Sequence, residues 1–181
     1  MSNKSALLKE LYSNISTTGA ITFSSKSLVN KMLSYANFQN AKLIIEMGGG
    51  DGSITRGIVE KMEEDAELWV FEVNEFFCQM LKEEFQSDRI HVICDSAANI
   101  NSYIKDRKVD LIFSSLPLSL IEKEEKNAIY QRSVDSLSEH GRFVQICYSY
   151  LLRFEFRKFF KQVQIHFTIK NFPPVFIMVC K

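Results

Sequence analysis

The chain has 181 residues, a length that favours one domain with a full hydrophobic core. Its 46% hydrophobic and 24% charged residues exclude a disordered chain, and its net charge of zero gives no sign of a nucleic-acid binder. The charge is uneven: residues 1–40 hold four lysines against one glutamate, and residues 151–181 hold six Lys or Arg against one. These basic ends indicate either a face that meets anionic lipid or phosphate, or merely uneven surface charge.

From residue 42 onward, apolar runs typical of strands alternate with segments whose apolar residues recur at helical spacing. The expected strands, in chain order, are 42–47, 67–73, 89–94, 109–114, 143–148, 163–169 and 175–180. The expected helices are 53–62, 75–85, 121–137 and 151–160. His140 and Gly141 are expected to end the third of these helices, because glycine tolerates the left-handed conformation that stops a helix.

Repeated strand–helix units predict an α/β fold with a mostly parallel sheet and helices on both faces. The last two strands have only a connection containing Pro173 and Pro174 between them, so we expect an antiparallel edge there. Residues 1–40 are expected to form a helical extension of two short helices, and residues 41–181 the main domain.

Cys78, Cys94, Cys147 and Cys180 are far apart in the sequence and lie within apolar patterns. We expect reduced, buried thiols of a cytoplasmic protein, with no disulfide and no metal site. The N-terminus lacks the apolar stretch of a signal peptide, and no segment has membrane-spanning length, so any membrane contact is expected to be peripheral.

The segment 43–53, LIIEMGGGDGS, concentrates glycine at the turn after the first expected strand, with Gly48, Gly49, Gly50 and Gly52. Open α/β sheets bind ligands at this turn, and a backbone without side chains can approach a ligand closely. The spacing departs from the dinucleotide pattern G-x-G-x-x-G, and the Lys-Ser/Thr ending of a phosphate loop is missing. The loop therefore predicts a ligand that is not centred on a pyrophosphate.

Acidic residues lie at the ends of three successive expected strands. Glu72 can accept hydrogen bonds from both hydroxyls of a ribose, or be a solvated strand end. Asp95, followed by Ser96, can accept a hydrogen bond from an adenine amino group, or cap the next short helix. Glu46 can fix the loop or approach a cationic ligand. Their joint placement favours a nucleoside site.

Over residues 19–181, these motifs resemble the class I S-adenosylmethionine-dependent methyltransferases, with IIEMGGGDG similar to their first motif, FEVN to the second and CDSA to the third. The resemblance implies a Rossmann-like, seven-stranded sheet whose last pair is antiparallel. It implies S-adenosylmethionine as cofactor and S-adenosylhomocysteine as product. It places Glu46 and residues 48–52 near the methionine part, Glu72 at the ribose, and Asp95 with Ser96 at the adenine.

Four further segments, GAITFSSKSLVNKM, IFSSLPLS, GRFVQICYSY and NFPPVFIMV, resemble the bacterial phospholipid N-methyltransferases, which methylate phosphatidylethanolamine. In that group the segment before the first strand helps to cover the cofactor, which implies this role for Thr22, Phe23, Ser24 and Ser25. The group is itself similar to the ribosomal RNA adenine dimethylases, which carry an Asn/Asp-Pro-Pro-aromatic motif after the fourth strand.

At that position this chain has Ser114, Ser115, Leu116 and Pro117. A serine hydroxyl and a backbone carbonyl can still orient an amine, but the stacking aromatic that a flipped base needs is absent. The motif therefore favours an aliphatic amine, whose pKa of about 10 must fall before it attacks the methyl group. Tyr148 is a further candidate helper, or else a strand-end aromatic that covers the core.

A lipid substrate requires contact with the bilayer surface. Residues 4–15 place apolar side chains on one helical face with lysines off it, and residues 151–160 combine four phenylalanines with basic residues. Either helix can lie in the headgroup region or pack against the core. The leading hypothesis is N-methylation of phosphatidylethanolamine at an anionic membrane; the alternatives are methylation of RNA or of a soluble amine, and a cofactor-binding scaffold without catalysis.

Overall fold

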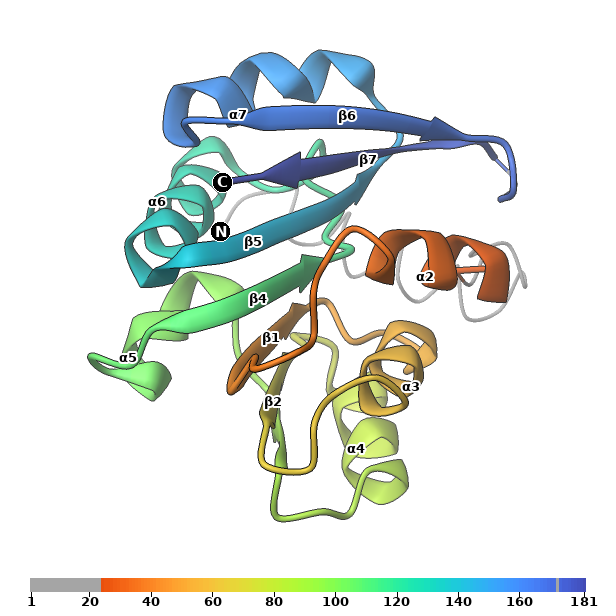
Figure 1. The fold of residues 1–181 in the computed structure, drawn as a ribbon, viewed down its shortest axis with the longest axis vertical. Helices are drawn as coiled ribbons and strands as arrows, with labels where there is room; N and C mark the ends of the chain where they lie inside the picture. Colours follow the sequence, from red (N-terminus) through yellow and green to blue (C-terminus); the bar gives the residue numbers. More distant parts are fainter. Residues whose placement is uncertain (1–23, 172) are drawn as a thin grey trace.

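The computed structural model describes residues 24–171 and 173–181, which contain a seven-stranded sheet in the order β3-β2-β1-β4-β5-β7-β6 (Figure 1). The strands are β1 (Leu43–Met47), β2 (Glu67–Phe71), β3 (Ile90–Ile93), β4 (Val109–Ser114), β5 (Leu137–Cys147), β6 (Val163–Thr168) and β7 (Val175–Cys180). Neighbours pair in parallel except β7, which is antiparallel to both β5 and β6. The predicted α/β sheet with antiparallel closing strands is confirmed.

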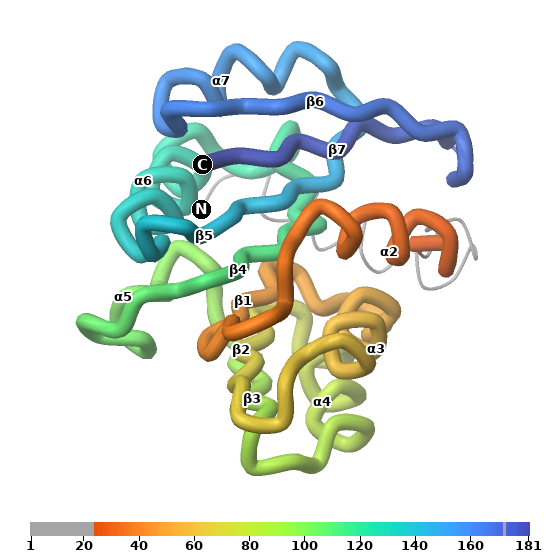
Figure 2. Tube along the Cα trace, in the orientation of Figure 1, coloured from red at the N-terminus to blue at the C-terminus, as the bar shows by residue number. Residues whose placement is uncertain are grey.

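The last strand in sequence is not the last strand in space. β7 reads VFIMVC and is buried along almost its whole length, which requires a neighbour on each side, β5 and β6. β6 reads VQIHFT, mixes polar and apolar residues and is mostly half-exposed, as suits an edge strand. Figure 2 shows the two edge strands, β3 and β6, at opposite ends of the sheet.

Helices cover both faces and divide the core into two clusters. Residues of α2, α3 and α4 pack on one face, and residues of η1, α5, α6, η2 and α7 on the other. The helices and 3₁₀ turns are α2 (Lys26–Leu33), α3 (Ser53–Val59), α4 (Glu75–Glu84), η1 (Ala97–Asn99), α5 (Ile100–Ile104), α6 (Lys123–Ser136), η2 (Tyr150–Leu152) and α7 (Arg153–Phe159). Within the described residues, no helix is both long and apolar enough to cross a bilayer.

The helix predicted at 121–137 ends differently from the prediction. Leu137 already has extended backbone, and β5 continues from it through His140 and Gly141. The prediction that these two residues end the helix is wrong. At Gly141 a Cβ would lie 2.8 Å from the Leu137 side chain and 3.0 Å from the Val109 carbonyl oxygen, so glycine serves the close approach of β5 to β4.

The described part of the N-terminal extension is packed into the core. Ser25 caps α2 by accepting a hydrogen bond from the Leu28 amide at 3.1 Å, and its hydroxyl donates to the Lys170 carbonyl at 2.9 Å. Gly57 allows α3 to pack closely against α2, because a Cβ at this position would lie 2.6 Å from the Val29 side chain. The helix expected at residues 4–15 lies outside the described residues, and the division after residue 40 stays a prediction.

Two of the four cysteines are joined. Cys78 of α4 and Cys94, directly after β3, form a disulfide with a Cα–Cα distance of 5.7 Å. The expectation of four reduced thiols is therefore wrong for this pair: the residues are distant in sequence, but α4 packs beside β3. Cys147 and Cys180 are buried free thiols, as expected, and burial raises the pKa of Cys147 to about 12.

We expect the protein purified without reductant to show two reactive thiols per chain in concentrated guanidinium, and four after reduction. The bridge closes a loop of 16 residues, so its reduction should lower the free energy of unfolding by about 3 kcal/mol. Thiol titration and denaturant unfolding check both points. Four reactive thiols before reduction would show that Cys78 and Cys94 are not joined.

Candidate cofactor and acceptor site

The predicted ligand-binding residues gather at one edge of the sheet, where the parallel strands end. The glycine loop follows β1, Glu72 follows β2, Asp95 follows β3, and the acceptor segment begins at Ser114, the last residue of β4. The strand order β3-β2-β1-β4 sets these segments in one row. The arrowheads of β4, β5 and β6 in Figure 1 point to this side, which we call the carboxyl edge, whereas β7 points away.

Two different constraints require glycine in the loop. Gly48, Gly50 and Gly52 have φ values of 83°, 50° and 78°, in the left-handed region that residues with side chains rarely adopt. Gly49 lacks this backbone, but a Cβ there would lie 2.6 Å from the Leu81 side chain of α4. At Gly50 a Cβ would meet nothing within 4 Å. Gly50 thus presents bare backbone to open space, whereas Gly49 serves packing.

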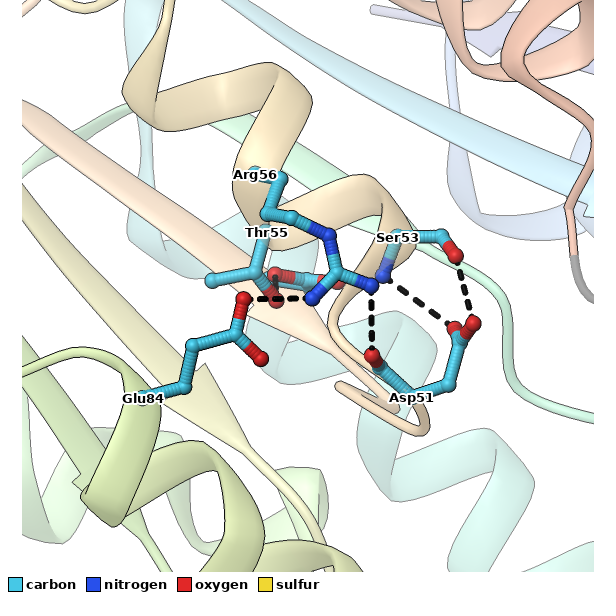
Figure 3. Close-up of polar contacts among 6 residues, drawn as sticks. Asp51, Ser53, Thr55, Arg56 and Glu84 are labelled. Carbon is cyan, nitrogen blue, oxygen red and sulfur yellow. Dashed lines mark hydrogen bonds and ion pairs between the residues drawn. The ribbon is translucent and has the colours of Figure 1, made fainter.

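Side chains of the loop and of α3 hold this conformation (Figure 3). Asp51 accepts hydrogen bonds from the Ser53 amide at 3.1 Å and from the Ser53 hydroxyl at 2.5 Å. Arg56 donates to the Asp51 carbonyl at 2.9 Å and forms an ion pair with Glu84 of α4. The loop is therefore braced on α3 and α4.

Glu46, in β1, is fully buried. The Thr55 hydroxyl donates to Oε2 of Glu46 at 2.7 Å, while Oε1 accepts no hydrogen bond from any described residue. Burial raises the pKa of Glu46 to about 8, because desolvation outweighs the stabilising hydrogen bond from Thr55. One oxygen thus ties β1 to α3, and the other has no partner among the described residues. The carboxyl is neutral below about pH 8, and this second oxygen becomes an acceptor for a cationic ligand when the ligand displaces the proton.

Glu72 connects two loops through one carboxylate. Oε2 accepts from the Gly50 amide at 2.9 Å, and Oε1 accepts from the Asn74 amide at 2.8 Å. Burial raises the pKa of Glu72 above its ordinary value, although these backbone hydrogen bonds oppose the shift. Only 3% of the residue is exposed, so it is not a solvated strand end. A carboxylate has about four lone-pair sites, which leaves two for the hydroxyls of a ribose.

Asp95 and Ser96 have separate roles. Ser96 caps η1 by accepting from the Ala98 amide at 3.2 Å, which is the role that the sequence left open for Asp95. Asp95 accepts from the Asn99 side chain at 2.9 Å and from the Tyr103 hydroxyl at 2.8 Å. Although burial by itself raises the pKa of Asp95, these hydrogen bonds and one from the Ser96 amide hold it below its ordinary value. Asp95 is therefore a preoriented carboxylate.

The start of the acceptor segment is joined to the glycine loop. The Ser115 hydroxyl donates to the Gly48 carbonyl at 2.8 Å, and the Ser115 amide donates to the Met47 carbonyl at 3.0 Å. Ser114 is buried, with its hydroxyl oxygen 3.5 Å from the Leu116 amide. Ser115 therefore sets the distance between the cofactor side and the acceptor side of the site.

The carbonyls that the sequence assigned to the acceptor amine already have donors. The Leu116 carbonyl accepts from the Gln145 side-chain amide at 3.1 Å and from the Leu118 backbone amide at 2.8 Å. The Pro117 carbonyl accepts from the Leu120 amide at 2.8 Å. An amine approaching the Leu116 carbonyl must therefore replace one of its donors, and the segment forms a rigid frame.

Gln145 is a residue that sequence reasoning missed. It is fully buried in β5, opposite Ser114 in the ladder, and its amide nitrogen also donates to the Ile146 carbonyl at 2.6 Å. Its Oε1 accepts no hydrogen bond from the described residues. The signal was a single amide inside the apolar run GRFVQIC, since a buried polar side chain in a central strand needs a specific partner.

The remaining predicted residues lie around the acceptor side. Tyr148 follows β5 and is 56% exposed, so it does not cover the core as the alternative interpretation expected. Ser24 directly precedes Ser25, whose contacts are with the β6–β7 connection. Thr22 and Phe23 lie outside the described residues, and their covering role stays a prediction.

Comparison with known proteins decides the family. Residues 44–141, more than half of the chain, match the family model for a methyltransferase domain. The chain belongs to this methyltransferase family. The enzyme is S-adenosylmethionine-dependent, as predicted. The predicted assignment of the chain to the class I methyltransferases is also confirmed.

A curated relative of this methyltransferase is the ornithine lipid N-methyltransferase of Singulisphaera acidiphila, 26% identical over 149 residues, or 80% of this chain and 78% of that one. Precorrin-6y C5,15-methyltransferase from Geobacter metallireducens aligns with a TM-score of 0.72 at 12% identity, over 90% of this chain and 91% of that one. The T. thermophilus 16S rRNA N2 G1207 methyltransferase, in complex with AdoMet and guanosine, aligns with a TM-score of 0.68 at 11% identity. This alignment covers 91% of this chain and 44% of that one. The two structures show the shared fold.

The residues present fit the cofactor of this methyltransferase. S-adenosylmethionine carries a cationic sulfonium and an ammonium group, a ribose with two hydroxyls, and an adenine. We propose that the unpartnered Glu46 oxygen and the bare backbone at Gly50 face its methionine part, that Glu72 holds the ribose, and that Asp95 binds the adenine. Each partner has the charge or hydrogen-bonding capacity that its assigned group needs.

We expect Gly50→Val to lower the affinity for S-adenosylhomocysteine at least about tenfold, because the added side chain fills the open space beside the loop. Valine at position 50 would have to adopt the left-handed φ of Gly50, which costs on the order of 1–2 kcal/mol of stability. Gly49→Val is the contrasting variant, since its side chain collides with Leu81 and Val70, and it should lower the melting temperature further. Calorimetric titration and thermal unfolding separate the two. Unchanged affinity of the Gly50 variant would contradict the loop assignment.

The buried Glu46 makes stability fall as pH rises. Its pKa of about 8 in the fold exceeds the ordinary value of 4.5, so the folded chain keeps a proton that the unfolded chain loses between these pH values. The free energy of unfolding should therefore decrease with pH by up to about 1.4 kcal/mol per unit over this window. Glu46→Gln, measured without cofactor, should make this decrease smaller, and the part that remains includes the contribution of Glu72, whose pKa is also raised.

Denaturant unfolding at about pH 5, 6, 7 and 8 measures this slope. Glu64→Gln removes an exposed carboxyl and serves as the control, with a slope like that of the wild type. If the wild type and the Glu46→Gln variant show the same pH dependence, the carboxyl is not held protonated by burial.

Proposed function

We propose that this methyltransferase transfers methyl groups from S-adenosylmethionine to the amine of a membrane lipid headgroup, with phosphatidylethanolamine as the first candidate acceptor. The observation that carries the proposal is the relative aligned over 80% of the chain, which is named for N-methylation of a lipid. The segments that resemble bacterial phospholipid N-methyltransferases support the same class of acceptor. Ornithine lipid, the acceptor in the relative's name, is the second candidate within this class.

The acceptor side is consistent with a small aliphatic amine. The segment after β4 holds Ser114, Ser115, Leu116 and Pro117 where an adenine acceptor calls for a stacking aromatic. Leu118, the next residue, is buried and turned into the core. These residues supply short polar groups and backbone, which suits an amine that is positioned by hydrogen bonds rather than by stacking.

Bound S-adenosylmethionine supplies an electrophilic methyl group, so the task of the chain is positioning. Ser115 fixes the acceptor segment to the glycine loop, and Gln145 fixes the Leu116 carbonyl. The Ser114 hydroxyl and the Tyr148 side chain remain the candidate groups for orienting the neutral amine. An ammonium cannot attack, so deprotonation before transfer is required, and the positive sulfonium of the bound cofactor favours the neutral amine because like charges repel.

We expect expression in a host without N-methylated lipids to produce mono-, di- or trimethylated derivatives of phosphatidylethanolamine, or N-methylated ornithine lipid if the host makes that lipid. Lipid mass spectrometry detects a shift of one, two or three methyl groups. The Gly50→Val variant, whose cofactor affinity should be lower, is the matched control and should yield much less of these products.

Methyl transfer from radiolabelled cofactor to RNA but not to liposomes would favour the RNA alternative. Transfer to a soluble amine alone would favour a small-molecule enzyme. Cofactor binding without transfer to any amine would favour the scaffold without catalysis. Any of these three results, obtained with soluble and cofactor-bound protein, would overturn the proposed lipid acceptor.

A further inference from the structure

The exposed large apolar side chains of the described residues are confined to one part of the molecule. All of them lie at or just beyond the carboxyl ends of strands: Val73 and Phe76 after β2, Leu120 after β4, Tyr148, Tyr150, Leu151 and Phe154 after β5, and Phe167 and Ile169 at the end of β6. Scattered single apolar residues are ordinary on a protein surface, but a collection at one edge marks an interaction site. This edge is also the one that carries the candidate cofactor and acceptor residues.

The part of this edge formed by β5 and β6 is a continuous strip of aromatic rings. The Arg153 guanidinium lies over the rings of Tyr150 and Phe154, at 3.7 and 4.1 Å from their centroids. The Tyr150 ring packs on Phe176 at 5.3 Å, and Phe176 packs on Phe167 at 5.1 Å. The strip therefore runs from the start of α7 across β7 to β6. We call these residues, with Leu151 and Ile169, the aromatic strip.

The helix that carries the strip is anchored from its other face. Phe156 and Phe160 are buried in the core, and Lys126 of α6 forms an ion pair with Glu155 at 2.8 Å. The sequence left α7 as either a core helix or a membrane helix. In the structure one face of α7 packs in the core through Phe156. The other face is exposed through Phe154, and Leu151 of η2 is exposed beside it. Leu151 is 69% exposed and Ile169 75%.

The charge beside the aromatic strip indicates which kind of partner binds there. At this edge Arg153 lies over the rings of Tyr150 and Phe154, and Lys170 directly follows the exposed Ile169. Glu155, the one acidic residue among residues 148–170, is already paired with Lys126. Aromatic rings interleaved with long basic side chains suit the bilayer interface, where the rings enter the headgroup region and the cations meet anionic phosphates. A soluble substrate offers no reason to surround the site with exposed Leu, Ile and Phe.

We propose that the aromatic strip docks onto a bilayer surface that contains anionic lipid, and that it thereby brings the carboxyl edge to a headgroup amine. This inference rests on the proposed lipid acceptor, and it names the surface by which the enzyme would contact the bilayer that holds that lipid. The docking involves no covalent step. The strip is adjacent to the acceptor side, since Tyr148 links the end of β5 to η2. A headgroup held at the strip is therefore next to the acceptor segment.

The test is co-sedimentation with vesicles of phosphatidylcholine and phosphatidylglycerol, which reads binding without any methyl transfer. Leu151→Glu with Phe154→Glu should weaken vesicle binding at least about tenfold, by removing apolar contact and adding repulsion from anionic lipid. Phe167→Glu with Ile169→Glu tests the β6 end of the strip independently and should weaken binding similarly. Raised salt should weaken wild-type binding as well.

Gln86→Glu with Asn101→Glu is the matched control. It adds two carboxylates at exposed positions, in segments that lead toward the amino ends of β3 and β4, and should bind vesicles like the wild type. Thermal unfolding confirms that each variant is folded. Both strip variants should keep wild-type activity on a short-chain phosphatidylethanolamine dissolved as monomers, because they leave the candidate site intact.

Unchanged vesicle binding by both strip variants would overturn the proposal. So would a wild-type dimer that either strip variant separates into monomers in analytical ultracentrifugation, because the strip would then be an interface between copies. If vesicle binding falls as expected but no lipid amine is ever methylated, the docking surface stands and the proposed function fails.

Discussion

The site depends on one buried carboxylate that holds two backbone turns together. Glu72 accepts a hydrogen bond from the Gly50 amide in the turn after β1 and another from the amide of Asn74, the N-cap of α4. Neither turn can shift without losing a hydrogen bond in a place that water hardly reaches, where an unmet acceptor costs more than in solvent. The glycine loop keeps its left-handed backbone under this constraint. The proposed cofactor side is therefore preformed, and Glu46 adds a buried carboxyl oxygen that has no partner among the described residues.

The acceptor side is built on a different principle. Its segment is fixed to the glycine loop by Ser115 and to β5 by Gln145, so its backbone groups are largely satisfied before any acceptor arrives. Such a frame determines where the acceptor atom lies but leaves its chemical identity to the surrounding surface. A shared methyltransferase fold by itself therefore does not fix the acceptor.

The strand order places the proposed cofactor site, the proposed acceptor site and the aromatic strip at the carboxyl edge. β1 to β3 contribute the proposed cofactor side, β4 and β5 the proposed acceptor side, and β5 to β6 the aromatic strip. Because β7 is antiparallel and inserted between β5 and β6, β6 ends at the same edge as the parallel strands, and its terminal Phe167 and Ile169 join the side chains that follow β5. The inserted strand thus widens the exposed apolar surface beside the acceptor side.

The sequence by itself determined the α/β class, the seven strands, the glycine loop and its acidic partners, because each depends on local periodicity or on residues within one strand–turn–helix unit. It misplaced the end of α6, since only the approach of β5 to β4 explains Gly141, and it missed the Cys78–Cys94 bridge, since only the packing of α4 beside β3 joins those residues. The role of Gln145, the donors on the Leu116 carbonyl and the gathering of exposed aromatics at one edge were likewise decided by tertiary structure. They arise from contacts between strands far apart in the chain, which no local pattern encodes.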